Sequence, residues 1–188
     1  MNRRIISLAT TLTLLAAGSL PAQHPMRELT VDATSDADFA LVDLDAGTVL
    51  PAGTPDSATP WQLGVQRYAL RLNHGITAAL LVDNTLLVAG NPLFMLSAEA
   101  QQRFDSVTEA DIPPPERFGS RLPSSVAVED SPPFVYGVDP SNPHAVSPTF
   151  NIYLVKDGDA VYKVQFLSYY HPVTGAARMI TIRFARLR

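Results

Sequence analysis

Three histidines occupy positions at which a side chain could bind a metal ion or another ligand. His74 follows a predicted strand, His144 stands in the loop before the C-terminal strands, and His171 lies between the last two of these strands. Imidazole is the commonest metal ligand in proteins, and loops on β scaffolds carry many binding residues. Because loops also hold polar residues without a role, the three are candidate ligands only, with Tyr136 as a candidate partner.

The signatures of the common enzyme classes are absent from the sequence. It contains no Gly-x-Ser-x-Gly elbow, no His-Glu-x-x-His, no phosphate-binding glycine loop and no dinucleotide fingerprint. Two aspartate pairs, Asp43 with Asp45 and Asp157 with Asp159, could bind calcium or act as acid and base. Both pairs stand at turn-like sites, where Asp caps backbone amides. We therefore favour the turn interpretation and expect no enzyme.

The charge and the cysteine content exclude several other classes of protein. The formal net charge is -4 and no segment gathers Lys and Arg, so the chain would repel a polyanion and we expect no nucleic-acid partner. Cysteine is missing altogether. The sequence therefore predicts no disulfide, no thiolate metal site and no lipid attached to a cysteine.

Residues 1–22 have the three-part layout of a secretory signal. Arg3 and Arg4 give a basic start, residues 5–17 a short apolar run, and Ser19 to Ala22 an exit ending in a small residue. The apolar run is shorter than the roughly 20 residues that a membrane span needs. We expect cleavage after Ala22. The domain of residues 23–188 would then be exported, either periplasmic or secreted, neither lipid-anchored nor membrane-spanning.

The middle of the chain predicts short strands separated by loops. Strands are expected over residues 26–33, 38–43 and 62–73, the last with a bulge at Gln66-Arg67 where the alternation of apolar residues breaks. Residues 78–89 offer two short apolar runs around Asp83-Asn84, as in a hairpin. Residues 97–103 predict a brief helix with Ser97 as N-cap.

The C-terminal part predicts a three-stranded meander over residues 150–155, 162–166 and 180–184. Tyr162, Val164 and Phe166 alternate with Lys163 and Gln165, which is typical of a half-buried strand with one polar face. Asp157-Gly158-Asp159 would form the first turn. Prolines gather between residues 111 and 148 and predict loops there. The expected fold is an all-β, antiparallel, sandwich-like single domain with long Pro-rich loops.

Two segments resemble the HmuY family of bacterial haem-binding envelope proteins. Residues 60–75, PWQLGVQRYALRLNHG, are similar to the family's Trp-Asp-x-Ala-x-x-Arg-Tyr-x-x-Arg-x-Asn-x-Gly strand, with Gln62 in place of the Asp. Residues 142–170 resemble the family's closing pattern: a loop with His and Pro, a strand, an Asp-Gly turn, then Tyr-x-Lys-Leu-Gln. These matches cover about a third of the chain, in the family's order.

The resemblance implies an exported all-β protein that captures haem for iron acquisition and delivers it to an outer-membrane receptor of the TonB-dependent type. Family members hold the iron through two His or Met side chains, yet residues 96–143 contain neither. His144 is the leading candidate for the metal ligand, with Tyr136, His74 and His171 as possible partners. A single axial ligand, a Tyr or His elsewhere, and loss of haem binding all stay open.

A second hypothesis comes from another class of function. The chain could be a non-haem envelope interaction module that docks a protein through exposed strand edges or through the Pro-rich loop 111–148. This module would give no spectral response to haem.

Overall fold

The computed structural model describes residues 25–58, 60–84, 97–123, 126, 130–138 and 141–188. The expected signal, residues 1–22, lies outside the described residues, as does the second apolar run expected after Asp83-Asn84. None of the helices in the described part of the chain is long and apolar enough to cross a membrane.

A five-stranded antiparallel sheet forms the centre of the molecule, in the order β1-β11-β10-β9-β6. The strands β9, β10 and β11 lie side by side and confirm the predicted meander. The chain turns from β9 into β10 at Gly158. The aspartates on either side of that glycine favour a tight turn, which sets the register of Ala160 opposite Asp157. The strands are β1 (Arg27–Asp32), β6 (Thr77–Val82), β9 (Ile152–Asp157), β10 (Ala160–Tyr170) and β11 (Ala177–Arg186).

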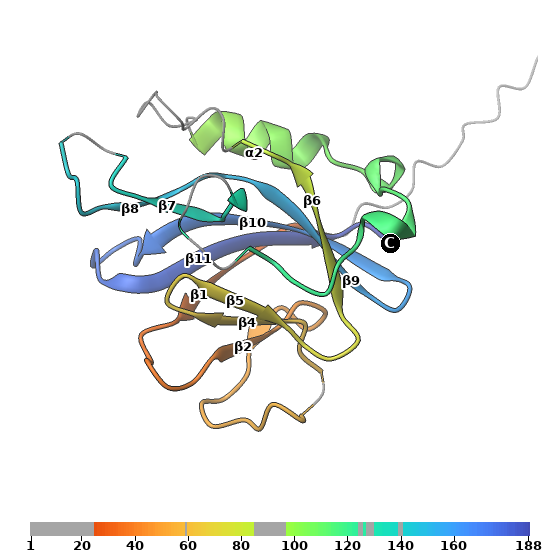
Figure 1. Ribbon diagram of the computed structural model, residues 1–188, viewed down its shortest axis with the longest axis horizontal. Coiled ribbons are helices and arrows are strands. Elements are labelled where there is room, and N and C mark those ends of the chain that lie inside the picture. Colours follow the sequence, from red (N-terminus) through yellow and green to blue (C-terminus); the bar gives the residue numbers. More distant parts are fainter. Residues whose placement is uncertain (1–24, 59, 85–96, 124–125, 127–129, 139–140) are drawn as a thin grey trace, which may run out of the picture.

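A four-stranded antiparallel sheet, in the order β3-β2-β4-β5, packs below the first (Figure 1). Its strands are β2 (Ala40–Asp43), β3 (Thr48–Val49), β4 (Leu63–Gln66) and β5 (Ala69–Leu72). The prediction of one bulged strand over residues 62–73 is wrong, because the chain reverses at Arg67 and pairs β4 with β5. Arg67 has a φ of 55°, a conformation that usually calls for Gly or Asn.

The main core lies between these two sheets. Alternate residues of each strand point into it, including Val42, Leu63, Val164 and Ile182, all with 0% exposure. The two-sheet arrangement confirms the predicted all-β, antiparallel, sandwich-like fold.

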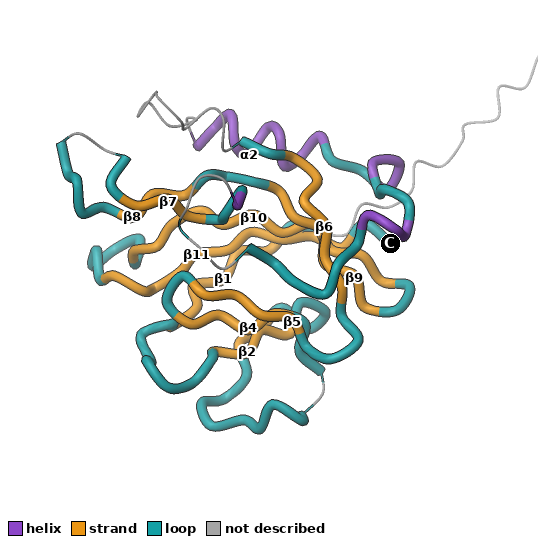
Figure 2. Tube along the Cα trace, in the orientation of Figure 1, coloured by secondary structure: helices purple, strands orange, loops and turns teal. Residues whose placement is uncertain are grey.

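One helix, α2 (Ser97–Ser106), covers the other face of the five-stranded sheet (Figures 1 and 2). The helix was predicted, but the polar face expected for the C-terminal strands was wrong: Lys163, Gln165 and Arg183 are buried. They lie beneath α2, whose Phe104 and Ala100 are fully buried beside them. Buried polar groups need partners, and the helix supplies backbone carbonyls to Lys163 and Gln165.

The Pro-rich stretch contains little regular structure, as expected. Its described part holds two short 3-10 helices, η1 (Glu109–Asp111) and η2 (Pro115–Arg117), and then a two-stranded hairpin. The hairpin strands are β7 (Phe134–Tyr136) and β8 (Val146–Pro148), which pack next to β10.

Candidate functional site

The β7–β8 hairpin is held firmly against β10. Phe134 is fully buried and makes edge-to-face contacts with Phe166 and Tyr169, with ring centroids 5.7 and 5.6 Å apart. On the second strand, the Val146 N–H donates to Tyr170 Oη at 3.0 Å. Aromatic pairs of this geometry add to the free energy of plain burial. The base of the hairpin is therefore a rigid support for the residues above it.

Two of the four candidate residues meet at the open end of this hairpin. Tyr136 is the last residue of β7 and is 51% exposed, and His144 is exposed in the loop that leads to β8. A hydrogen bond of 2.8 Å joins Tyr136 Oη to His144 Nδ1. Their ring centroids are 6.3 Å apart and the ring planes are tilted by 50°.

The loop conformation brings this pair together. The Gly137 N–H donates to Ala145 O at 3.0 Å, which closes the loop directly above β7 and β8. Gly137 has a φ of 70°, and a Cβ there would lie 3.0 Å from the carbonyl oxygen of Pro143. Only glycine combines that dihedral angle with that close approach. His144 is thereby folded back toward Tyr136.

His171 lies nearby in the chain but its imidazole is occupied. It starts the turn between β10 and β11, and its Nδ1 accepts hydrogen bonds from the N–H groups of Val173 and Thr174, both at 3.1 Å. In a neutral ring the proton then sits on Nε2, so neither nitrogen offers a free lone pair. The arrangement makes His171 a turn-stabilising residue, and a role as ligand would require it to leave these contacts.

His74 lies far from the Tyr136–His144 pair. It is exposed in the turn between β5 and β6, where its N–H donates to Asn73 Oδ1 at 2.8 Å. Figure 2 shows this turn and the β7–β8 hairpin at opposite sides of the molecule. A single small ligand could not contact both.

The pair offers one oxygen and one nitrogen donor. No group of three or more His, Cys, Asp or Glu side chains that could enclose a metal ion is found among the described residues. A phenol and an imidazole cannot form a closed metal cage, but each can serve as an axial ligand of an iron whose other positions are filled by a macrocycle. The chemistry of the pair thus fits haem better than a bare ion.

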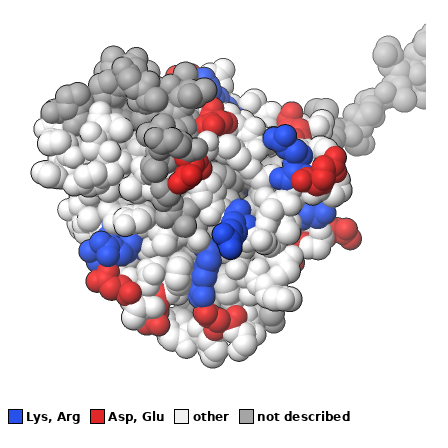
Figure 3. All heavy atoms as spheres, viewed as in Figure 1, with Lys and Arg blue, Asp and Glu red and all other residues white. Residues whose placement is uncertain are grey.

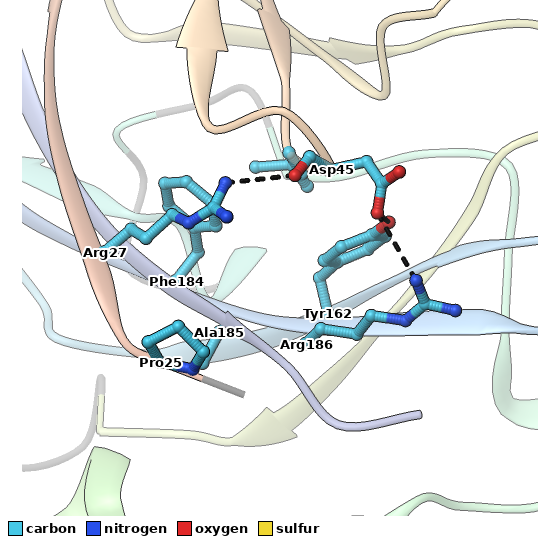
Figure 4. A pocket seen from close by; sticks show the side chains of 8 residues that line it. Pro25, Arg27, Asp45, Tyr162, Phe184, Ala185 and Arg186 are labelled. Atoms are coloured by element: carbon cyan, nitrogen blue, oxygen red, sulfur yellow. Dashed lines mark hydrogen bonds and ion pairs between the residues drawn. The ribbon is translucent and has the colours of Figure 1, made fainter. Parts of the chain in front are cut away.

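A small polar pocket opens where the turn after β2 meets the five-stranded sheet (Figure 4). Its volume is about 140 Å³, below the range of typical ligand pockets. Asp45 Oδ1 accepts from Tyr162 Oη at 3.0 Å and lies 3.4 Å from Arg186 Nη1, while Arg27 donates to Asp45 O. Burial and the Asp45 carboxylate raise the pKa of Tyr162, which keeps it a neutral donor. Asp45, Tyr162, Arg186 and Arg27 thus all have hydrogen-bond partners within the pocket, so we assign it a structural role.

A larger groove of about 380 Å³ lies between the loop after β1 and the loop after β3. Its lining includes Phe39, Leu41 and Leu50 together with Asp32 and Thr34, but no His, Met or Tyr that could bind iron. Charged side chains on the face drawn in Figure 3 are of mixed sign and do not gather into one large patch. The groove therefore contains no candidate iron ligand.

The aspartate pair at the turn after β2 behaves as the turn interpretation predicted. Asp43 Oδ1 accepts from the N–H groups of Asp45 and Ala46 at 3.0 and 2.9 Å. At the other pair, Asp157 Oδ2 accepts from Gln62 Nε2 at 3.0 Å.

Comparisons with known proteins show similarity in structure but not in sequence. No family model matches the chain, and no curated protein matches it. Among solved structures, one described as an HmuY-like haem-binding protein from Bacteroides vulgatus superposes with a TM-score of 0.55 at 17% identity, covering 88% of this chain and 93% of the other. A protein described as a lipoprotein, from Bacteroides fragilis, gives 0.53 at 17% identity, with coverage of 87% and 90%.

The apo form of an HmuY analog from Tannerella forsythia gives a TM-score of 0.51 at 14% identity, covering 89% of this chain and 98% of the other. The chain therefore shares its fold with HmuY-like proteins, over nearly their whole length.

Proposed function

We propose that this chain is an exported haem-binding protein of haem and iron acquisition, and that the β7–β8 hairpin supplies its iron-binding side chains. The observation that carries the proposal is the Tyr136–His144 pair, two side chains of types that can bind haem iron, joined by a 2.8 Å hydrogen bond on an exposed hairpin. The shared HmuY-like fold makes haem the ligand to test first.

The surroundings of the pair suit a flat, largely apolar guest. The turn between β10 and β11 lies at the same end of the molecule as the hairpin (Figure 1) and exposes Val173, at 87%. Tyr136 itself is one of the few large apolar side chains left exposed in the described part of the chain. A flat guest held by Tyr136 could cover apolar surface at this end of the molecule and so remove it from water.

The proposal includes export and delivery of the bound haem to an outer-membrane receptor. The layout of residues 1–22 supports export. An exposed site on a surface hairpin supports delivery, because a receptor could contact the bound haem without the protein unfolding. Retention of the haem-loaded protein, but not the haem-free protein, on outer-membrane extracts would test this step.

Titration of the purified protein with ferric haem, followed through the Soret band, tests binding. We expect a saturable red shift at one equivalent, and the double variant Tyr136→Phe/His144→Ala should lower the affinity by more than about tenfold, since loss of ligand groups costs at least that much. His74→Ala is the matched control, because the β5–β6 turn that carries this histidine lies at the other side of the molecule. Its titration should equal that of wild type.

A wild-type titration without a Soret shift would contradict the proposal. Binding of a protein from outer-membrane extracts in that case would favour the alternative, an interaction module of the same fold. If the double variant binds haem as wild type does, the protein would still be a haem binder, but its site would lie outside this hairpin.

A further inference from the structure

We infer that Tyr136 is the residue that binds the iron, that His144 acts as the acceptor of its proton, and that the site consequently prefers ferric over ferrous haem. This inference rests on the proposed function and adds to it the identity of the ligand atom and the preferred oxidation state. It starts from the direction of one hydrogen bond.

A single proton lies between Tyr136 Oη and His144 Nδ1, 2.8 Å apart. If His144 were the ligand in the usual way, its Nδ1–H would donate to the phenol oxygen and leave the Nε2 lone pair free for iron. A phenol, however, is a better donor than acceptor, and a neutral imidazole nitrogen is a strong acceptor. The favoured arrangement therefore has the Tyr136 hydroxyl donating to His144 Nδ1, with the imidazole proton on Nε2. His144 then has no lone pair to offer.

The backbone also holds Tyr136 more firmly than His144, which again favours Tyr136 as the ligand. Tyr136 ends a strand whose preceding residues, Phe134 and Val135, are fully buried, and it is paired in register with Val146. His144 stands in the loop, which the Gly137–Ala145 hydrogen bond closes. A ligand on a strand is held more precisely than one on a loop. The strand-borne phenol, 51% exposed, is the better placed of the two to approach a guest.

The change of state on binding is a proton transfer within the pair. Tyr136 would give its phenolic proton to His144 Nδ1, and the deprotonated Oη would be the atom that holds the iron. No electron moves and no other reactant is needed. The resulting imidazolium keeps its hydrogen bond to the phenolate and offsets part of its negative charge. An anionic, hard oxygen donor favours Fe(III) over Fe(II), as expected for tyrosinate ligation of haem.

Single variants separate the two roles when ferric and ferrous haem are titrated in parallel. Tyr136→Phe removes one exposed oxygen and should leave the fold intact, yet it should abolish the tyrosinate modes in the resonance Raman spectrum. His144→Ala should keep these modes and weaken ferric affinity by about tenfold, as loss of an outer partner does. Wild type should bind ferric haem at least about tenfold more tightly than ferrous haem, whereas Tyr136→Phe should lose this preference.

The opposite pattern would overturn the inference: wild-type spectra in Tyr136→Phe and lost ligation in His144→Ala would make His144 the ligand while haem binding itself stands. A wild-type protein that ignores haem would instead defeat the proposed function. A measurement without haem checks the first step separately. Nitrogen-15 shifts of His144 should show Nδ1 unprotonated and Nε2 protonated, and the reverse tautomer would contradict the proposed direction of the hydrogen bond.

Discussion

Tyr153 is the largest of the fully buried side chains, and its hydroxyl needs a partner inside the protein. That hydroxyl donates to Ser131 O at 2.7 Å and lies 3.4 Å from Asn151 Nδ2. Burial raises the pKa of Tyr153 well above that of an exposed phenol, with hydrogen bonds from neighbouring polar groups acting in the opposite direction. Ser131 stands shortly before β7. The hydrogen bond from Tyr153 therefore also connects the central sheet to the segment that enters the hairpin.

The raised pKa of Tyr153 predicts a loss of stability in alkali. Above about pH 10 the unfolded chain releases the phenolic proton while the folded chain keeps it, so the free energy of unfolding falls by up to about 1.4 kcal/mol per pH unit for this group. Tyr153→Phe should cost about 1 kcal/mol at pH 8 through the lost hydrogen bond. Because it lacks the titrating group, its deficit relative to wild type should shrink by pH 11.

Urea denaturation of both proteins at pH 8 and pH 11 measures these differences, with Tyr68→Phe, a partly exposed tyrosine, as the control. A Tyr153→Phe deficit that stays constant between the two pH values would show that the buried phenol titrates as it does in the unfolded chain.

Strands and helices show where sequence patterns were sufficient and where they were not. The meander of β9, β10 and β11 was predictable because alternating apolar residues flank an Asp-Gly-Asp turn. The β4–β5 hairpin was missed because Arg67 takes the left-handed conformation without Gly or Asn to indicate it. His144 and Tyr136 could be chosen as candidates by type, but their contact depends on the left-handed conformation of Gly137 and on its hydrogen bond to Ala145, which no sequence pattern indicated.

The polar residues beneath α2 show a second limit of pattern reading. Lys163 alternates with apolar residues as a solvent-facing residue would, yet it is 6% exposed. Its Nζ donates to Phe104 O at 2.7 Å and to Val107 O at 2.9 Å, and it lies 4.5 Å from the Phe104 ring. A cation at the carbonyl end of a helix is favourable. Burial lowers the pKa of Lys163, against the opposing effect of Asp105 and Asp111.

Lys163→Met should therefore loosen α2 more than the sheet beneath it. The methionine fills a similar volume but donates no hydrogen bond, so the two carbonyls lose a donor and the fold should lose about 1–3 kcal/mol of stability. Native-state hydrogen exchange should accelerate in residues 97–106 before it does in β9 to β11. Lys156→Met, which replaces a half-exposed lysine of the same sheet, should change stability by less than about 0.5 kcal/mol. Uniform acceleration across the protein would contradict a local role.

Across the whole molecule, the two sheets are joined by polar contacts as well as by their shared core. One of these contacts uses Gln62, which stands directly before β4 and is 2% exposed. Its Oε1 accepts from the Leu44 N–H at 2.7 Å, and its Nε2 donates to Asp157 Oδ2 at 3.0 Å, at the end of β9. The amide therefore connects the four-stranded sheet to the five-stranded one. An ionised aspartate or glutamate at this position could accept from Leu44 but could not donate to Asp157.

Replacing this amide by an acid should make the stability of the whole sandwich depend on pH. In Gln62→Glu, one carboxylate oxygen can still accept from Leu44, but the other would face the Asp157 carboxylate at hydrogen-bond distance. Two carboxylates in such contact repel each other unless they share a proton. We expect a loss of about 2–4 kcal/mol at pH 7.5, and recovery of about half of it at pH 4.5, where one proton occupies the pair.

Gln62→Leu is the matched control for this experiment, because it removes both hydrogen bonds without adding a charge. It should lose about 1–3 kcal/mol at either pH, since a buried N–H of Leu44 is left without its acceptor. Urea denaturation at both pH values yields the difference between the two variants. The difference in free energy of unfolding between Gln62→Glu and Gln62→Leu should narrow or reverse in acid, because residue 62 lies within 3.0 Å of Asp157 Oδ2. A difference that does not change with pH would mean that the introduced carboxylate turns away from Asp157, and would contradict the prediction.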